Sequence, residues 1–116
     1  SDDVKLSDPV GYVQFVALMK HSAFVLTDSG GIQEETTALK VPCVTARTTT
    51  ERPITIDIGT NVLVQPERVP ILDAVFNVLD GNRQQGTVPD LWDGMAATRI
   101  VDVVANIFSH EHIIER

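Results

Sequence analysis

Apolar residues in this chain follow two patterns that predict two kinds of secondary structure. Short, mainly apolar runs are typical of strands, and they occupy residues 4–6, 24–26, 43–46 and 61–64. Apolar residues spaced three and four apart predict helices over residues 11–21, 31–40 and 70–79, with a last helix after Asp93. This alternation predicts an α/β fold class, a Rossmann-like doubly wound parallel sheet.

Breaker residues set the expected ends of these helices, and apolar residues set their faces. Asp80-Gly81-Asn82 ends the third helix, and Asp93 caps the last. We expect the second helix to turn Ile32, Ala38 and Leu39 inward. The apolar faces of the third and last helices carry, respectively, Leu72, Val75, Phe76 and Leu79, and Ile100, Val101, Val104, Ile107 and Phe108.

The corner between the strand at residues 24–26 and the helix after it carries the clearest candidate chemistry. Ser29 is a residue type that caps helices, and Gly30 and Gly31 allow a tight turn and close approach of a ligand to the backbone. The free N–H groups and the positive dipole end of such a helix favour phosphate. Glu35 lies one turn further along, where it could accept hydrogen bonds from sugar hydroxyls. The simpler alternative is that this turn only caps the helix.

A second polar loop follows the strand at residues 43–46 and carries two arginines, Arg47 and Arg52. The carboxyl ends of parallel strands meet at one edge of a sheet, so this loop is predicted to lie beside the glycine turn. Both arginines are then candidates to neutralise a bound phosphate. The alternative is that they form a solvated ion-pair network with Asp57, Glu51 or Glu34.

Composition limits the size and the partners of the chain. Its 116 residues suffice for one compact domain, and a hydrophobic fraction of 43% with 22% charged residues indicates a packed core. A net charge of −7 weighs against nucleic acid and anionic membranes as partners, because both require clustered Lys and Arg. No apolar run has the length of a membrane span, and no signal-peptide pattern opens the chain.

Cysteine and histidine offer little chemistry of their own. Cys43 is the only cysteine, so no internal disulfide is possible and a reducing, cytoplasmic location is the simplest inference. Nothing near Cys43 in sequence would lower its pKa, which argues against a nucleophile. His110 and His112 are two positions apart, so on a helix they point to nearly opposite sides and are not expected to share a metal.

Four motifs occur in order along almost the whole chain: Phe15-Val16-Ala17-Leu18-Met19, Thr27-Asp28-Ser29-Gly30-Gly31-Ile32-Gln33-Glu34-Glu35, Thr49-Thr50-Glu51-Arg52-Pro53, and Trp92-Asp93-Gly94-Met95-Ala96-Ala97 with Arg99-Ile100-Val101. With them the chain resembles the C-terminal part of the non-hydrolysing UDP-N-acetylglucosamine 2-epimerases, two-lobed proteins of the GT-B fold. The resemblance implies that residues 1–116 are a single UDP-binding α/β domain, a partial C-terminal lobe.

The same resemblance implies roles for individual residues. Ser29, Gly30 and Gly31 match the family's diphosphate cradle. Glu35 matches the carboxylate that holds the uridine ribose, and Arg52 matches a substrate-binding arginine on the facing loop.

The base end of the implied site lies earlier in the chain. Phe15 matches a residue that flanks the uracil, although its own pattern favours a position in the core. Val10 falls where the family contacts the base through main-chain atoms. In such enzymes UDP is eliminated across C1–C2 of the sugar and added back on the other face, and that scheme requires no metal, nicotinamide or other cofactor.

No catalytic residue is assigned in this chain. The family's acid/base carboxylates and a histidine near the substrate belong to parts that do not match this sequence, and proton abstraction needs a positioned base. We therefore expect an inactive fragment that lacks its N-terminal lobe and, through exposed apolar surface on the sheet edge or last helix, can form a homodimer. The alternatives are the nucleotide-sugar lobe of a GT-B glycosyltransferase and a non-catalytic nucleotide-binding module.

The sequence departs from the family pattern at two places. Ile54 stands where a glutamate is often found after the Arg-Pro pair. Lys40-Val41-Pro42 replaces a usual Gly-Lys-Pro, which is expected to affect the end of the second helix because glycine tolerates a left-handed backbone.

Overall fold

The computed structural model describes residues 2–82 and 86–114, with the side chains of its last helix described through residue 110. Three parallel strands form one sheet in the order β1 (Val25–Thr27), β2 (Cys43–Ala46) and β3 (Asn61–Val64). The helices are α1 (Tyr12–Lys20), α2 (Gly30–Leu39), α3 (Ile54–Asp57), α4 (Arg68–Leu79) and α5 (Ala96–Ile114).

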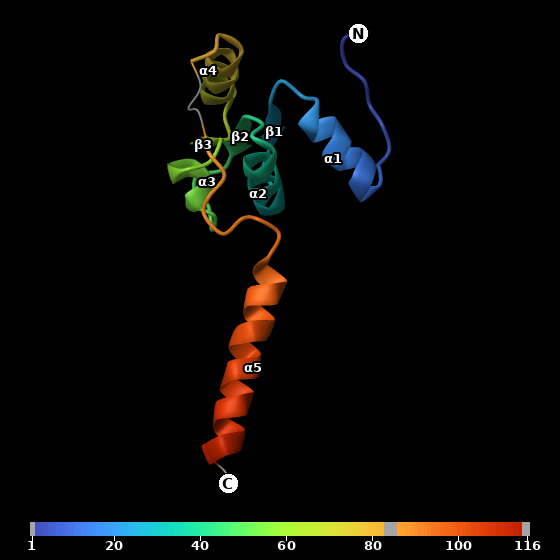
Figure 1. The fold of residues 1–116 in the computed structure, drawn as a ribbon. Helices are drawn as coiled ribbons and strands as arrows, with labels where there is room; N and C mark the ends of the chain where they lie inside the picture. The colour runs from blue at the N-terminus through green and yellow to red at the C-terminus, as the bar shows by residue number, and fades with distance from the viewer. Residues whose placement is uncertain (1, 83–85, 115–116) are drawn as a thin grey trace.

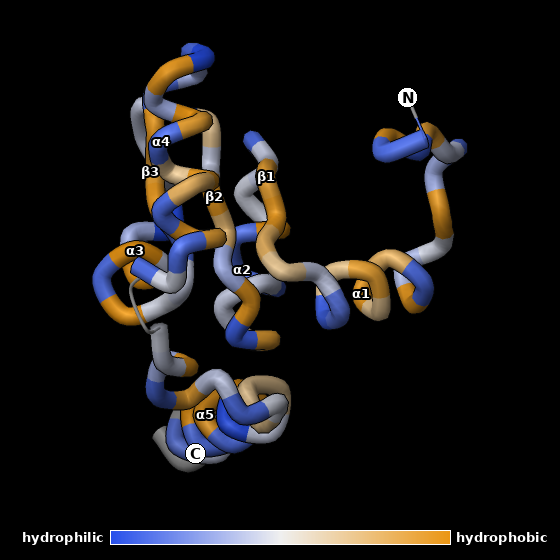
Figure 2. Tube along the Cα trace, turned by 90° about the horizontal axis from the view of Figure 1, so that it is seen from above, coloured by the Kyte–Doolittle hydropathy of each residue, from blue (hydrophilic) through white to orange (hydrophobic). Residues whose placement is uncertain are grey.

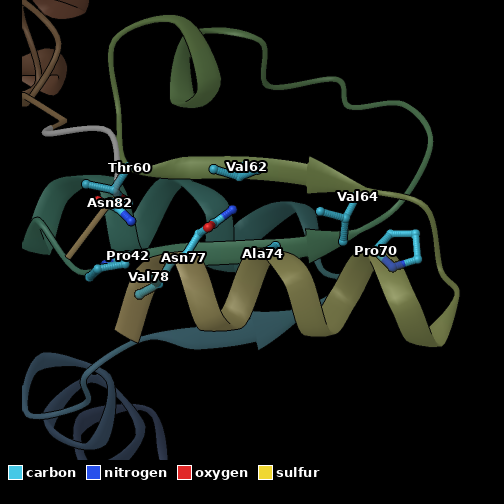
Figure 3. A pocket seen from close by; sticks show the side chains of 9 residues that line it. All are labelled: Pro42, Thr60, Val62, Val64, Pro70, Ala74, Asn77, Val78 and Asn82. Atoms are coloured by element: carbon cyan, nitrogen blue, oxygen red, sulfur yellow. The ribbon is translucent and has the colours of Figure 1, made fainter. Parts of the chain in front are cut away.

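The helices cover the two faces of the sheet. The chain passes through α2 between β1 and β2, and through α3 between β2 and β3. Figure 3 shows α4 on the near face of the sheet and α2 behind it. α1 packs beside α2, whereas α5 extends away from the sheet (Figure 1), so the molecule measures 71 × 29 × 22 Å.

The strands predicted at residues 43–46 and 61–64 are confirmed, and the one predicted at residues 4–6 is wrong. Within residues 2–82 and 86–114 no strand pairs with the outer edge of β1, and Leu6 is 96% exposed. A strand is stable only when a neighbour accepts its hydrogen bonds. The same open edge leaves Leu26 of β1 48% exposed, although a buried strand was expected there.

The inner face of α2 is polar, which corrects the prediction for this helix. Ala38 is exposed, whereas Gln33, Thr36 and Thr37 are fully buried. Gly59 packs so closely against Thr37 that a side chain there would collide with Thr37 and with the backbone. Hydrogen bonds rather than apolar periodicity therefore decide which face of α2 lies inward.

The apolar face predicted for α4 is also largely exposed. Phe76 and Leu79 are more than half exposed, and α4 instead turns Pro70, Ala74 and Val78 toward the sheet (Figure 3). The sequence of α4 carries apolar residues on both sides, so its periodicity alone does not identify the packed face.

The last helix leaves the apolar side chains described for it largely exposed. Ile100 is 61% exposed and Phe108 is 65% exposed, and Figure 2 shows hydrophobic residues on this helix as well as on the strands. α5 begins at Ala96, three residues beyond the predicted cap Asp93. The Asp93 carboxylate accepts the Met95 N–H at 3.0 Å and pairs with Arg99. No helix in the described residues combines the length and apolar character that crossing a membrane requires.

Lys40 stands at the end of α2, where the family pattern usually has glycine. Lys40 is the C-cap, and its backbone is left-handed, with φ 59° and ψ 34°. The adjacent N–H of Val41 donates to Thr36 O at 2.9 Å, which closes the helix. A residue with a Cβ is disfavoured in this conformation.

We predict that Lys40→Gly stabilises the fold by about 0.5–1 kcal/mol, because the left-handed strain removed exceeds the extra chain entropy of glycine. Urea unfolding of the two proteins measures the difference. Lys20→Gly, in the right-handed last turn of α1, is the matched control and should destabilise by about 1 kcal/mol. Equal destabilisation by both substitutions would contradict the account.

Candidate anion and nucleotide site

The start of α2 presents free backbone N–H groups. Ser29 is the N-cap residue, in an extended conformation, and its side chain makes no capping hydrogen bond. Its own N–H donates to Thr27 Oγ1 at 3.1 Å. No side chain in the described residues caps the N–H groups of Gly30 and Gly31, which therefore remain available to an anion at the positive end of the helix.

The arginine loop lies beside this turn, which confirms the predicted juxtaposition. The Thr50 hydroxyl donates to Gln33 Oε1 on α2 at 2.7 Å. Arg52 Nε lies 2.5 Å from Glu34 Oε1, also on α2. Both loops thus meet at the carboxyl edge of the sheet.

The arginines also form the ion pairs that the sequence left as the alternative. Arg47 Nη1 lies 3.2 Å from Glu51 Oε2, and Arg52 pairs with Glu34. The Arg52 Nε–H lacks the alignment of a hydrogen bond to its carboxylate neighbour. Within the described residues its two terminal nitrogens have no partner, so they can still donate to a ligand.

A carboxylate already lies at the start of α2. A Cβ on Gly30 would collide with Glu51 Oε1, so this oxygen rests against the first residue of the helix. The pKa of Glu51 is lowered, first by a hydrogen bond from its own backbone N–H and then by Arg47 and Arg52. Of these causes, the two arginine charges would also favour another anion at this corner.

Buried polar side chains connect this corner to the sheet. Asn61, fully buried at the start of β3, donates to Gln33 Oε1 and Thr55 Oγ1 and accepts the Thr45 hydroxyl. Sequence analysis missed these residues, because Gln, Asn and Thr within apolar patterns were not treated as core. The one available signal was an amide side chain, Asn61, at the first position of a predicted buried strand.

Cys43 lies on β2 beside this network and is not suited to act as a nucleophile. Burial raises the pKa of its thiol, and interactions with the Thr45 and Thr36 hydroxyls only partly offset that effect. The thiol consequently stays protonated near neutral pH, as the sequence indicated.

Glu35 lies on the side of α2 that faces α1 and the loop before α5. It lines a 400 Å³ pocket with Trp92 and Ala38, and a 150 Å³ pocket with Tyr12 and Val16 of α1. The structure therefore places an indole ring and a carboxylate together, a pair that sequence analysis did not connect.

The two residues predicted at the base end lie further toward the amino terminus. Phe15 is half-buried on α1, the helix that packs against α2. Val10 precedes α1 and is 42% exposed.

A separate pocket of 300 Å³ lies between α4 and the sheet, on the face opposite α2 (Figure 3). The described side chains that line it, among them Val62, Ala74 and Asn77, are uncharged. This pocket offers no cation for a phosphate, so it is a weaker candidate than the glycine corner.

Metal ligands do not gather in the described part of the chain. No group of three or more His, Cys, Asp or Glu side chains is placed to hold an ion there. His110 is exposed, and the side chain of His112 lies outside the described residues.

Comparison with known proteins identifies relatives that agree with the resemblance carried by the sequence motifs. A family model described as UDP-N-acetylglucosamine 2-epimerase matches residues 1–105. The Methanocaldococcus jannaschii protein of that name is 41% identical over 101 residues, which is 87% of this chain and 27% of the relative.

Solved structures give the same result. The M. jannaschii UDP-GlcNAc 2-epimerase in complex with UDP-GlcNAc and UDP matches with a TM-score of 0.77 at 40% identity, over 88% of this chain and 28% of that one. The S. aureus MnaA–UDP co-structure matches with a TM-score of 0.84 at 32% identity, over 94% of this chain and 30% of that one. The chain thus spans less than a third of these proteins. The likeness confirms the predicted α/β fold class as part of a GT-B lobe.

We predict that the Gly30 amide reports the ionisation of Glu51. Because the pKa of Glu51 is lowered from its usual 4.5, its carboxylate contact at the corner should persist above that value and be lost as pH falls through the lowered pKa. Amide NMR shifts of Gly30 followed against pH measure the midpoint.

The control is Glu51→Gln, which should abolish the inflection at Gly30 and leave the other glycine amides unchanged. A midpoint at or above 4.5 would contradict the arrangement.

Proposed function

The chain belongs to the UDP-N-acetylglucosamine 2-epimerase family, and on that premise we propose that residues 1–116 form a single UDP-binding domain of such an enzyme. The intact enzyme would interconvert UDP-GlcNAc and UDP-ManNAc. Its N-terminal lobe would complete the site. The names of the relatives favour this function over a glycosyltransferase lobe or a non-catalytic module.

The diphosphate of UDP is proposed to bind at Ser29, Gly30 and Gly31. The observation that carries this proposal is the Glu51 carboxylate resting against Gly30 beside uncapped N–H groups. A diphosphate would take the place of this carboxylate, with more charge and more acceptor oxygens for the N–H groups.

Arg52 is proposed to hold the diphosphate, and Glu35 is proposed to hold the ribose. We propose that the terminal nitrogens of Arg52 reach the diphosphate from the second loop, while Glu34 holds the guanidinium through its Nε. Glu35 accepts hydrogen bonds from the ribose hydroxyls beside Trp92. Phe15 and Val10 complete the site at the base.

The proposed chemistry is elimination of UDP from the sugar followed by its re-addition. The diphosphate gains negative charge as it leaves C1, so preorganised N–H donors and a guanidinium bind the transition state more tightly than the ground state. We assign no general base, metal or nicotinamide step to this chain. The chain alone is therefore proposed to bind UDP without epimerising its sugar.

The remaining proposals concern cellular setting and partners. We place the enzyme in the cytoplasm, consistent with a single free and buried cysteine, Cys43. We also propose that the exposed apolar side of α5 is covered by the missing lobe or by a second copy of the chain.

UDP titration tests the proposal. We predict saturable, weak binding to the 116-residue chain, with no UDP-ManNAc formed from UDP-GlcNAc. Glu35→Ala and Arg52→Ala should each weaken binding about 10- to 100-fold, the usual effect of losing a charged hydrogen bond. Calorimetry or NMR measures the affinity.

Glu67→Ala and Arg68→Ala, exposed at the start of α4, are the matched controls and should bind UDP as the unchanged chain does. Submicromolar affinity for UDP-GlcNAc, or equal losses in the controls, would contradict the proposal.

A further inference from the structure

Gln33 is a long polar side chain with no exposed surface, and both of its polar atoms are engaged. Its Nε2 donates to the carbonyl of Ser29 at 3.3 Å. Its Oε1 accepts the Thr50 hydroxyl at 2.7 Å and the Asn61 amide at 3.0 Å. One side chain therefore connects the glycine turn, the arginine loop and β3.

The hydrogen bonds continue to the backbone on both sides of Arg52. The Thr50 hydroxyl donates its proton to Gln33 and accepts the Arg52 N–H at 2.9 Å. The Thr55 hydroxyl donates to the Arg52 carbonyl at 2.7 Å and accepts from Asn61 Nδ2 at 3.2 Å. Both peptide groups of Arg52 are thus held by hydroxyls that belong to one network.

From this geometry we propose that Gln33 and Thr50 are positioning residues for UDP binding. They fix the distance between the N–H groups after Ser29 and the guanidinium of Arg52, so that both reach one diphosphate. The inference rests on the proposed function. It adds a way in which buried side chains determine the geometry of the site. Neither side chain contacts the nucleotide in this account.

A purely structural role does not explain the arrangement. An apolar side chain at Gln33 would fill the core without requiring three partners, and polar networks are weak sources of stability when apolar packing is available. Thr36 shows the difference, because it is equally buried on α2 yet its hydroxyl donates to Ile32 O of its own helix at 2.7 Å. Thr50, by contrast, joins the arginine loop to α2 through its hydrogen bond to Gln33.

The test compares UDP affinity and unfolding free energy for five variants of the 116-residue chain. Thr50→Val should weaken UDP binding about 10-fold, and Thr50→Ser, which keeps the hydroxyl, should restore it to within about twofold. Thr36→Val is the control: it should destabilise the fold to a similar degree and leave UDP affinity unchanged. In an Arg52→Ala background, Thr50→Val should change affinity less than about twofold, because the group it positions is gone.

Three results would overturn the proposal: equal loss of affinity in Thr50→Val and Thr36→Val, no restoration by Thr50→Ser, or full additivity of Thr50→Val with Arg52→Ala. Hydrogen exchange of the Arg52 amide gives a readout without nucleotide. It should accelerate about 10-fold in Thr50→Val and not in Thr36→Val. Absence of UDP binding to the unchanged chain refutes the proposed function and the positioning role for UDP together, whereas unchanged Arg52 exchange refutes the coupling alone.

Discussion

A buried amide must find hydrogen-bond partners, and at Gln33 this requirement determines how the chain folds around its candidate site. An unpaired polar group in the core costs about 1–3 kcal/mol, so the segments that satisfy this side chain cannot move independently. Those segments are the turn at Ser29, the loop at Thr50 and the strand start at Asn61. The core of the domain is consequently polar where it supports the site. It is apolar at Val44 of β2 and Met19 of α1.

The anion site fits an acidic chain because its positive potential comes from local geometry. The net charge is −7, yet the start of α2 offers backbone dipoles, and Arg47 and Arg52 lie on the facing loop. Glu51 rests there and balances part of this charge. We propose that a nucleotide diphosphate can take the place of this internal carboxylate.

Sequence alone predicted the elements whose signal is local. The strands at residues 43–46 and 61–64 have mainly apolar sequences between turns. The strand at residues 4–6 failed because strands depend on neighbours that periodicity does not describe. The polar face around Gln33 was missed because partners up to 28 positions apart satisfy it, and no local pattern records them.

The central claim is that UDP binds at the start of α2 with Arg52 beside it, held there by the buried network. The most direct test is amide NMR of the labelled chain during addition of UDP. The account predicts the largest shift changes at Gly30, Gly31 and Arg52. Shift changes centred on the uncharged pocket between α4 and the sheet, with both glycine amides unmoved, would contradict it.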